Sequence, residues 1–436
     1  MFNASQVRRF AALAFVALIT VVSGALAASP AQAGTTPRDS FITQPQKKFS
    51  AFDIPPSPLP AGKPGDIIRW RPMGWSKSFT KPPKGTQGYK IMYLSTSATG
   101  ERIAVTASLM VPRAYQPKQG IENRPIIGYG NEAMGLGDNC AQSSMLEYAH
   151  SGELALQEPM LKRGYAVVST DYEGLGTPSV HTFGVSVSSG HAILDSVRAA
   201  RNLTEAGLPK QGPVALYGYS QGGQGIGRGM EMQPDYAPDV KPTAVAFGGT
   251  PTDPAKFSRY GSGKFFSAVN FAASAGFDAA YPELRLKDML NERGVIANAA
   301  TYNACIESIF VVPFRMSSAY LKPGMDPLVD PRWIKRFKEN AIGYEPPSPD
   351  VPVYYFHAIG DEAVPYSGAT KMRRQYCKAG VNLKFQAIPI MEHVATGPVW
   401  MPIAAQWVAD RLEGKPARGN FAPNCWPDSA SLPEES

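Results

Sequence analysis

The chain has 436 residues, of which 44% are hydrophobic and 18% charged, and its formal net charge is +7 at pH 7. This length allows one large domain or a domain with a sizeable insertion, and the composition is typical of a globular protein and excludes a disordered one. The Lys and Arg residues form no clustered run, which argues against nucleic acid as a partner. The charge favours solubility and, at most, transient contact with a lipid interface; no obligate protein partner is indicated.

Residues 1–33 have the layout of an export signal. Arg8 and Arg9 precede a short apolar run, Phe10–Val22, and two A-x-A patterns follow that end at Ala27 and Ala33. The run is too short to span a bilayer comfortably, which takes about 20 residues. We expect cleavage after Ala33, with Ala27 as the alternative, and a secreted mature chain.

Strands and helices alternate through most of the remaining chain. Residues 34–85 are rich in Pro, Gly, Lys and Ser and are expected to form an extended N-terminal arm over the core. From Gly88 onward the pattern predicts strands at Tyr89–Ser95, Arg102–Val111, Pro125–Tyr129, Tyr165–Asp171, Pro213–Tyr219, Thr243–Phe247, Val351–Ala358 and Leu383–Ile390. It predicts helices at Met145–Arg163, Gly190–Glu205, Gly222–Met232 and Gly397–Leu412. This alternation indicates an α/β fold with a mostly parallel sheet and helices on both faces.

The alternation breaks between residues 248 and 350, a stretch of helical character. We expect it to be a helical cap inserted into a core made of residues 86–247 and 351–425, with a C-terminal tail at 426–436. Phe265, Val269 and Ala273 have the spacing of one helix face, and such a stripe more often belongs to a core than to a substrate tunnel.

Gly218-Tyr219-Ser220-Gln221-Gly222 has the pattern G-x-S-x-G. The five residues alone are a weak signal, but a buried strand enters them and a Gly-rich helix start leaves them, as in the nucleophile elbow of the α/β-hydrolase fold. The tight turn presents the hydroxyl above the sheet, next to a helix N-terminus that stabilises negative charge. Ser220 is therefore the candidate nucleophile.

A serine needs a base to become nucleophilic, and in this fold the chain order is serine, acid, histidine. Of the five histidines, only His357 and His393 follow Ser220. His357 lies inside a predicted strand and precedes the best acid, whereas His393 is expected on the loop after the last strand. His393 is the candidate base, and His150, His181 and His191 are expected to have structural roles.

The candidate acid is Asp361. It follows a buried strand, and the string Gly360-Asp361-Glu362-Ala363-Val364-Pro365 is typical of the acid turn in this fold. Its role is to orient the imidazole and stabilise the imidazolium. Glu362 is the alternative acid.

The oxyanion of the reaction needs two backbone N–H donors. The first is expected at Gln221, directly after the nucleophile. The second is expected on the loop 130–134, where we favour Ala133 over Asn131 and Glu132. The nearby loop Asp171–Gly176 is expected to be a structural turn that Asp171 caps.

The four cysteines are Cys140, Cys305, Cys377 and Cys425, none of them in a C-x-x-C pair or at metal-ligand spacing from a histidine. Zinc or another metal is therefore not expected. In an exported protein, four cysteines indicate two disulfides, for which the residues alone allow three connectivities.

These features together resemble the secretory lipase family, which includes the lipase A-like enzymes of Candida and exported lipases of actinobacteria. The resemblance covers about residues 60–425. It rests on the signal peptide, Asn139-Cys140-Ala141, the D-Y-x-G-L-G loop at 171–176, the elbow G-Y-S-Q-G-G at 218–223, Asp361 and His393. It implies the disulfides Cys140–Cys305 and Cys377–Cys425, a helical cap before the acid-bearing strand, and no cofactor. At the oxyanion loop those relatives place an acidic residue among the donors, where this chain reads N-E-A-M-G at 131–135.

The expected function is hydrolysis of acylglycerols or simple esters through Ser220, His393 and Asp361 and an acyl-enzyme. Acyl transfer to an alcohol and peptide hydrolysis are alternatives on the same fold. A non-catalytic lipid-binding protein is the alternative from another class, although such a relative would be expected to have lost a triad member.

Overall fold

The computed structural model describes residues 48–417 except residues 76, 310–316 and 349. Within this part of the chain, nine strands form one sheet in the order β1-β2-β3-β5-β4-β6-β7-β8-β9. The strands are β1 (Ile67–Met73), β2 (Thr86–Thr96), β3 (Arg102–Pro112), β4 (Ile126–Gly130), β5 (Ala166–Thr170), β6 (Val214–Tyr219), β7 (Pro242–Gly248), β8 (Val353–Ala358) and β9 (Leu383–Ile388). The expected signal at 1–33 and tail at 426–436 lie outside the described residues.

The sheet changes character along its width. The pairs β1–β2, β2–β3 and β3–β5 are antiparallel, whereas the pairs from β5 through β4, β6, β7 and β8 to β9 are parallel. Strands β4, β5, β6 and β8 are buried along their whole length, as expected for strands covered on both faces. Because parallel strands end at the same edge, the residues that follow β6, β8 and β9 meet there.

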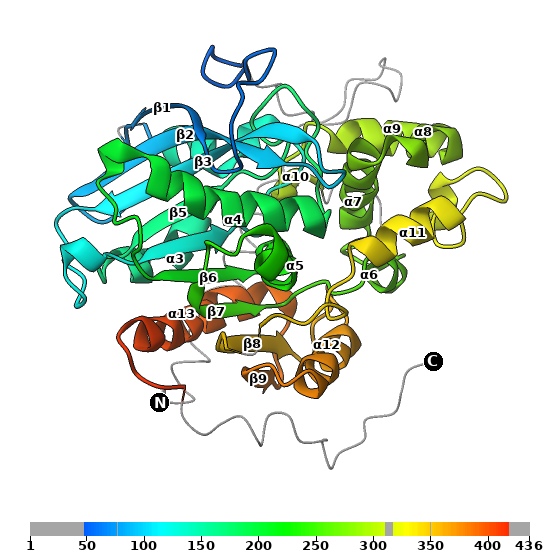
Figure 1. Ribbon diagram of the computed structural model, residues 1–436. Helices are drawn as coiled ribbons and strands as arrows, with labels where there is room; N and C mark the ends of the chain where they lie inside the picture. The colour runs from blue at the N-terminus through cyan, green and yellow to red at the C-terminus, as the bar shows by residue number, and fades with distance from the viewer. Residues whose placement is uncertain (1–47, 76, 310–316, 349, 418–436) are drawn as a thin grey trace, which may run out of the picture.

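Helices cover both faces of this sheet (Figure 1). On one face, α4 (Ser186–Asn202), α5 (Gln221–Tyr236) and α12 (Tyr366–Lys378) share a hydrophobic core with alternate strand residues such as Leu216. On the other face, α3 (Glu153–Leu161) and α13 (His393–Leu412) pack against the intervening residues such as Tyr217. The two-residue repeat of each strand thus divides its side chains between two cores.

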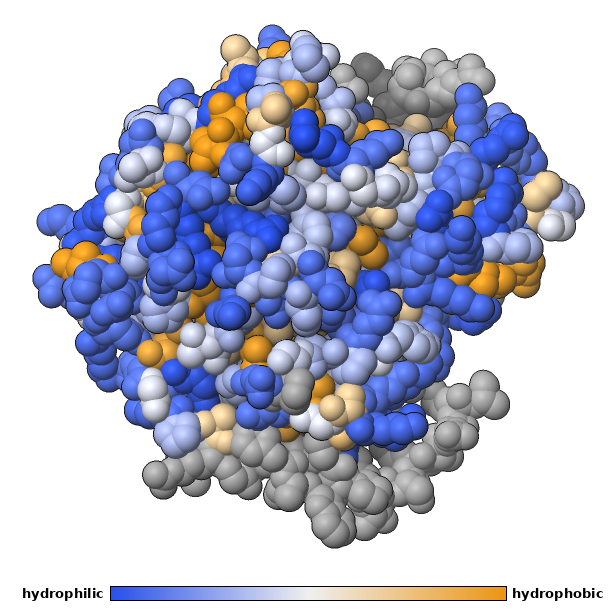
Figure 2. Space-filling model, viewed as in Figure 1, coloured by the Kyte–Doolittle hydropathy of each residue, from blue (hydrophilic) through white to orange (hydrophobic). Residues whose placement is uncertain are grey.

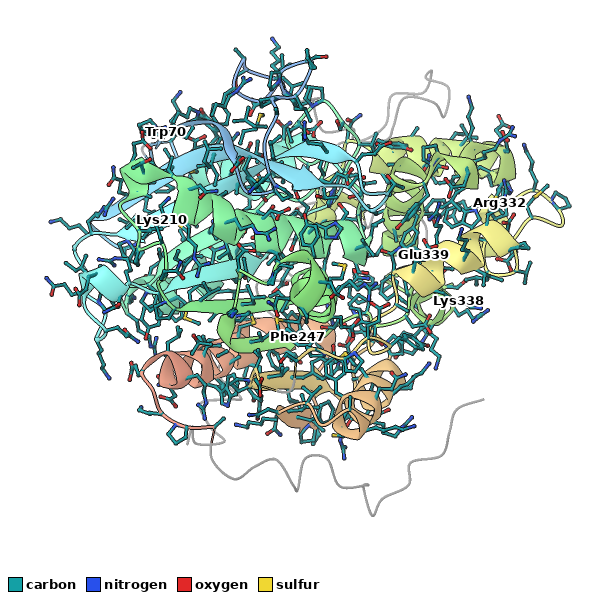
Figure 3. The ribbon with its side chains drawn as sticks, viewed as in Figure 1. Trp70, Lys210, Phe247, Arg332, Lys338 and Glu339 are labelled. Carbon is teal, nitrogen blue, oxygen red and sulfur yellow. A yellow bond between two sulfur atoms is a disulfide. The ribbon has the colours of Figure 1, made fainter. Side chains whose placement is uncertain are left out.

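The segment between β7 and β8 is helical and lies beside the sheet, at the right of Figure 1. Its α-helices are α6 (Pro254–Gly261), α7 (Ser267–Ala280), α8 (Leu286–Met289), α9 (Glu292–Thr301), α10 (Ile306–Ile309) and α11 (Pro331–Glu339). They have hydrophobic clusters of their own, one around Val269 and one around Trp333. Figure 3 shows Phe247 in the interior at β7, with Arg332 and Lys338 on α11 at the edge of the molecule.

The polar surface agrees with a water-facing exterior. The face in Figure 2 is mainly hydrophilic, and its hydrophobic residues form small separate groups. None of the helices in the described residues combines the length and the apolar character needed to cross a membrane.

Three of the differences between the predicted and observed elements concern the surroundings of the site. The helix expected at Met145–Arg163 is two helices, α2 (Gln142–Tyr148) and α3, because residues of the arm bind the backbone at the break: Phe79 N and Ser78 Oγ both donate to the carbonyl of Ala149, at 3.0 Å each. The arm itself contributes β1, an edge strand that tolerates Pro72.

The third difference concerns the start of α13. The helix begins at His393 instead of near Gly397, because the Glu392 carboxylate caps it and accepts the N–H groups of Val394 and Ala395 at 2.7 Å each. Pro398 and Pro402 lie inside this helix, as they did in the predicted one.

The disulfide Cys140–Cys305 is confirmed, with its Cα atoms 5.4 Å apart. It joins the loop after β4 to the segment before α10, beside the backbone bridge between Gly135 and Cys305. The second expected pair includes Cys425, which lies outside the described residues.

Candidate active site

Ser220 stands at the turn between β6 and α5. Its backbone has φ 54° and ψ −119°, a conformation that non-glycine residues rarely adopt. Its amide donates to the Gly248 carbonyl on the neighbouring strand at 2.9 Å, which helps to hold the turn. The side chain therefore projects beyond the carboxyl edge of the sheet, at the N-terminus of α5.

The glycine at position 222 is a steric requirement of this turn. A Cβ at Gly222 would lie 2.0 Å from the carbonyl oxygen of Gly130 and 2.4 Å from its carbon, both backbone atoms of β4. The first turn of α5 can pack this closely against β4 only without a side chain at that position.

His393 bridges Ser220 and Asp361. Its Nε2 lies 2.9 Å from Ser220 Oγ, and its Nδ1 lies 2.8 Å from Asp361 Oδ2. The backbone carbonyl of His393 accepts the Tyr219 hydroxyl at 2.9 Å, so the residue before the serine also fixes the histidine. These three candidates, 173 and 32 residues apart along the chain, thus form one hydrogen-bonded row.

Asp361 is anchored on its own turn. Its Oδ1 accepts the amides of Ala363 at 3.0 Å and Val364 at 2.7 Å, which leaves Oδ2 for the imidazole. The alternative acid, Glu362, instead accepts the backbone amide of His393 through Oε2 at 2.8 Å. The geometry therefore favours Asp361 as the partner of the imidazole ring, whereas Glu362 binds the backbone amide of His393.

The charges of the row stabilise each other. Burial alone lowers the pKa of His393, but the Asp361 charge and hydrogen bond outweigh it and raise the pKa to about 9. Burial raises the pKa of Asp361, but the His393 charge and hydrogen bonds from His357 and His393 hold it well below its usual range. Asp361 is thus a carboxylate that favours a proton on the imidazole, as a base in this position requires.

The expected oxyanion donors lie beside the serine. Gln221 is the first residue of α5, and Gln221 and Ala133 both line the same cavity as Ser220. The amide of Glu132 is already used, since it donates to Glu153 Oε1 at 3.3 Å. Among the candidates on the loop after β4, this leaves Ala133 favoured over Glu132 as the second donor.

Two neighbouring carboxyl groups were not predicted, that of the half-buried Glu132 on this loop and that of the buried Glu153 on α3. Glu153 accepts the Tyr129 hydroxyl at 2.7 Å as well as the Glu132 amide. Burial and the nearby Glu132 charge raise the pKa of Glu153 to about 8, and burial raises that of Glu132. No sequence signal marked Glu153, since an acidic residue in a helix is usually exposed.

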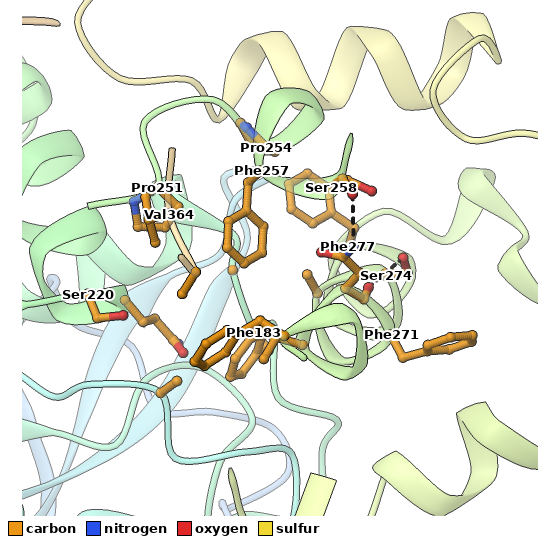
Figure 4. Close-up of a pocket in the computed structure, with 18 of the residues that line it drawn as sticks. Phe183, Ser220, Pro251, Pro254, Phe257, Ser258, Phe271, Ser274, Phe277 and Val364 are labelled. Atoms are coloured by element: carbon orange, nitrogen blue, oxygen red, sulfur yellow. Dashed lines mark hydrogen bonds between the residues drawn. The ribbon is translucent and has the colours of Figure 1, made fainter. Parts of the chain in front are cut away.

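A cavity of about 1000 Å³ opens from the serine into the helical segment. Ser220, His393 and Ala133 line it, and most of the other lining residues are apolar, among them Phe183, Phe257, Phe266, Phe271, Phe277, Leu286, Leu290, Leu328 and Phe337. Figure 4 shows Phe183 and Phe257 between Ser220 and Phe277. The expectation that Phe265, Val269 and Ala273 serve a core was wrong in part, because all three line this cavity.

The other histidines are placed away from Ser220 Oγ. His150 is exposed, and His191 stacks on Tyr236 with ring centroids 3.9 Å apart. His181 is buried, which lowers its pKa to about 4, and its Nε2 faces the side-chain Nε2 of Gln221 at 3.3 Å. His181 thus holds the side chain that follows the nucleophile, a contact that the sequence did not predict.

The loop Asp171–Gly176 is hydrogen-bonded to segments that surround the site. Asp171 accepts the Ser143 amide at 2.9 Å, near the start of α2, and the Tyr172 hydroxyl donates to the Asn131 carbonyl at 2.8 Å. The loop therefore fixes the oxyanion loop. The described residues include no group of three or more His, Cys, Asp or Glu side chains that could hold a metal ion.

Comparison with known proteins identifies the family of this chain. Residues 141–420 match the family model described as Secretory lipase. The chain belongs to the secretory lipase family. It is thereby placed among exported hydrolases with lipase or esterase function, as the resemblance implied.

Individual relatives agree with the family, and one of them is described as a probable inactive lipase. The secreted triacylglycerol lipase LIP1 of Malassezia furfur is 27% identical over 381 residues, which cover 84% of this chain and 75% of the relative. A probable inactive lipase of Mycobacterium tuberculosis is 25% identical over 389 residues, covering 86% of this chain and 84% of the relative. The closed state of Candida antarctica lipase A superposes with a TM-score of 0.72 at 22% identity, over 85% of this chain and 87% of that one. The fold is therefore that of an α/β-hydrolase.

Proposed function

We propose that this chain hydrolyses carboxylic esters, acylglycerols above all, with Ser220 as nucleophile, His393 as general base and acid, and Asp361 as the orienting acid. The observation that carries the proposal is the hydrogen-bonded row Ser220–His393–Asp361 at the head of an apolar cavity. The row supplies the chemistry, and the cavity offers an acyl chain about 1000 Å³ of mostly apolar space.

The steps follow from the contacts. Ser220 Oγ bonds to the ester carbonyl carbon while its proton passes to Nε2 of His393, which lies 2.9 Å away. The amides of Gln221 and Ala133 stabilise the oxyanion. The bond to the alcohol oxygen then breaks, and His393 returns its proton to that alcohol. Water resolves the acyl-enzyme by the same steps. It bonds to the acyl carbon while His393 takes its proton, the bond to Ser220 Oγ breaks, and His393 returns the proton to Ser220.

The helical segment 248–350 is proposed to act as the cap that shapes the acyl side of the site, over a core of 86–247 and 351–425. Support comes from the cap residues Phe257, Phe266 and Phe277, which line the cavity together with Ser220. One contact also ties cap to acid turn, since the Tyr260 hydroxyl of α6 donates to the Asp361 carbonyl at 2.9 Å.

The test is Ser220→Ala, measured with a p-nitrophenyl ester and an organophosphonate probe. Without the attacking oxygen, turnover should fall by about 10⁶-fold and labelling should disappear. Ser274→Ala is the matched control, because Ser274 lines the same cavity but its hydroxyl bonds the Asn270 carbonyl at 2.8 Å. Unchanged turnover in Ser220→Ala would refute the proposal, and an unlabelled, inactive natural chain would support a non-catalytic lipid-binding protein instead.

A further inference from the structure

A second imidazole contacts the carboxylate of Asp361. His357, the penultimate residue of β8, places Nε2 at 3.3 Å from Asp361 Oδ2, the oxygen that also faces His393. The side chain of His357 is fully buried. The imidazole of His393 thus meets Asp361 from the cavity side, and that of His357 meets it from inside the protein.

The contacts of His357 define which nitrogen carries its proton. Nε2 faces two acceptors, Asp361 Oδ2 and the Val364 carbonyl at 3.2 Å, so it must be the N–H donor. Nδ1 faces the Tyr355 hydroxyl at 3.2 Å, which can donate to it. Burial raises the pKa of Tyr355 well above its ordinary value, so this hydroxyl keeps its proton.

The neighbours of His357 place it beside Asp361 and away from Ser220. Among the described residues, the titratable groups in contact with it are Tyr355 on its own strand, Asp361 on the next turn and the Tyr366 ring of α12, at 5.9 Å between centroids. Ser220 Oγ is held by His393 on the far side of Asp361. His357 is therefore not placed to act as the base.

The carboxylate of Asp361 is surrounded by donors. Oδ1 accepts two backbone amides, and Oδ2 accepts the Nδ1–H of His393 and also lies 3.3 Å from Nε2 of His357. The one N–H at this nitrogen of His357 is shared between Asp361 Oδ2 and the Val364 carbonyl. This arrangement fixes the rotamer of Asp361 and divides its negative charge between two imidazoles.

We propose that His357 is a positioning residue of the reaction, which donates its Nε2–H to Asp361 and thereby limits how strongly this carboxylate holds a proton on His393. The inference rests on the proposed function of Ser220, His393 and Asp361. Its chemical consequence has a definite sign. Removing a donor makes the carboxylate more basic, so the imidazolium of His393 becomes harder to deprotonate. A merely structural role predicts the opposite, since a loosened Asp361 would stabilise the imidazolium less.

The experiment compares His357→Leu, His357→Gln and Tyr355→Phe by the pH profile of kcat/KM on a soluble p-nitrophenyl ester. In His357→Leu, the apparent pKa of the acidic limb should rise by about half a pH unit, with KM unchanged. At pH values below this pKa, kcat/KM should then be about threefold lower. His357→Gln places an amide N–H near the position of Nε2 and should restore the limb. Tyr355→Phe should shift it in the same direction as Leu, by less.

His191→Leu is the matched control, because His191 is another buried histidine but contacts Tyr236 and the Thr96 carbonyl instead of the row. It should leave the limb in place. A limb that moves downward in His357→Leu, or that moves equally in His357→Gln, would overturn the inference.

A second measurement does not depend on activity. The chain has five histidines, so a ¹⁵N-histidine spectrum of the intact protein can be assigned by one substitution each. His357 should show a protonated Nε2 and an unprotonated Nδ1. The opposite tautomer would overturn the inference even if the probe labels Ser220, whereas a correct tautomer without labelling would refute the proposed function alone.

Discussion

Both ring nitrogens of His393 have a partner, and this decides the proton positions in the site. Nδ1 donates to Asp361 and Nε2 accepts from Ser220, so the neutral ring is ready to take the serine proton. The Asp361 charge that raises the pKa of His393 also favours the protonated ring over this neutral form. The negative charge of Asp361, which stabilises the imidazolium during the reaction, therefore also lowers the fraction of free enzyme in which His393 is unprotonated.

The pH profile should carry this signature. Because His393 acts only when unprotonated, kcat/KM on a soluble ester should rise about tenfold per pH unit up to a limb near 9. Asp361→Asn removes the charge that raises this pKa, so the limb should move to lower pH while kcat falls by about 10⁴-fold.

Glu362→Gln is the comparison for that variant, since Glu362 bonds only the backbone amide of His393. It should reduce kcat far less than Asp361→Asn. If the two variants lose activity equally, the assignment of Asp361 as the orienting acid is wrong.

At the scale of elements, the strand–turn–helix unit of β6 and α5 positions Ser220. Ser220 is held with positive φ because β6 is fixed in the sheet and Gly222, in the first turn of α5, lies directly against Gly130 of β4. The charge-stabilising helix N-terminus and the nucleophile are thus set by one turn.

Gly222→Ala tests this turn. Its Cβ would meet the Gly130 backbone at 2.0 Å, so the elbow must shift, and both activity and folding stability should fall, by about 3 kcal/mol or more for stability. Gly229→Ala lies on the same helix, where the nearest atom to a Cβ is at 3.4 Å. That variant should be neutral or more stable, by up to about 1 kcal/mol.

Denaturant unfolding and ester turnover measure both variants. Equal stability of Gly222→Ala and the natural chain would show that the close contact of α5 and β4 is not needed.

At the scale of the molecule, the cavity exists because two parts of the chain meet. Core residues supply Ser220 and His393, and the segment between β7 and β8 supplies most of the apolar wall. The Cys140–Cys305 disulfide fastens this segment to the loop after β4, across a separation of 165 residues.

Replacing both cysteines by serine should therefore lower the free energy of unfolding by about 2–5 kcal/mol, because the unfolded chain gains the freedom of a long open loop. Each single replacement should give a similar loss, since either one opens the same bridge. A double variant that unfolds at the same denaturant concentration as the natural chain would contradict this expectation.

The sequence by itself determined the alternating strands, the elbow and the order serine, acid, histidine, because these are local patterns or simple consequences of chain order. It predicted β2–β9, Ser220, His393 and Asp361 at the carboxyl edge, and the Cys140–Cys305 pairing through the family resemblance. The roles of these site residues stay a prediction until the experiments above are done.

Only the tertiary structure decided which distant groups share a space. The convergence of His357 and His393 on Asp361, the contact of the Glu153 carboxyl with the Glu132 amide, and the cavity face of Val269 all depend on how separate segments pack together. Periodicity shows which face of an element is apolar, but it does not show whether that face meets a neighbour or an opening.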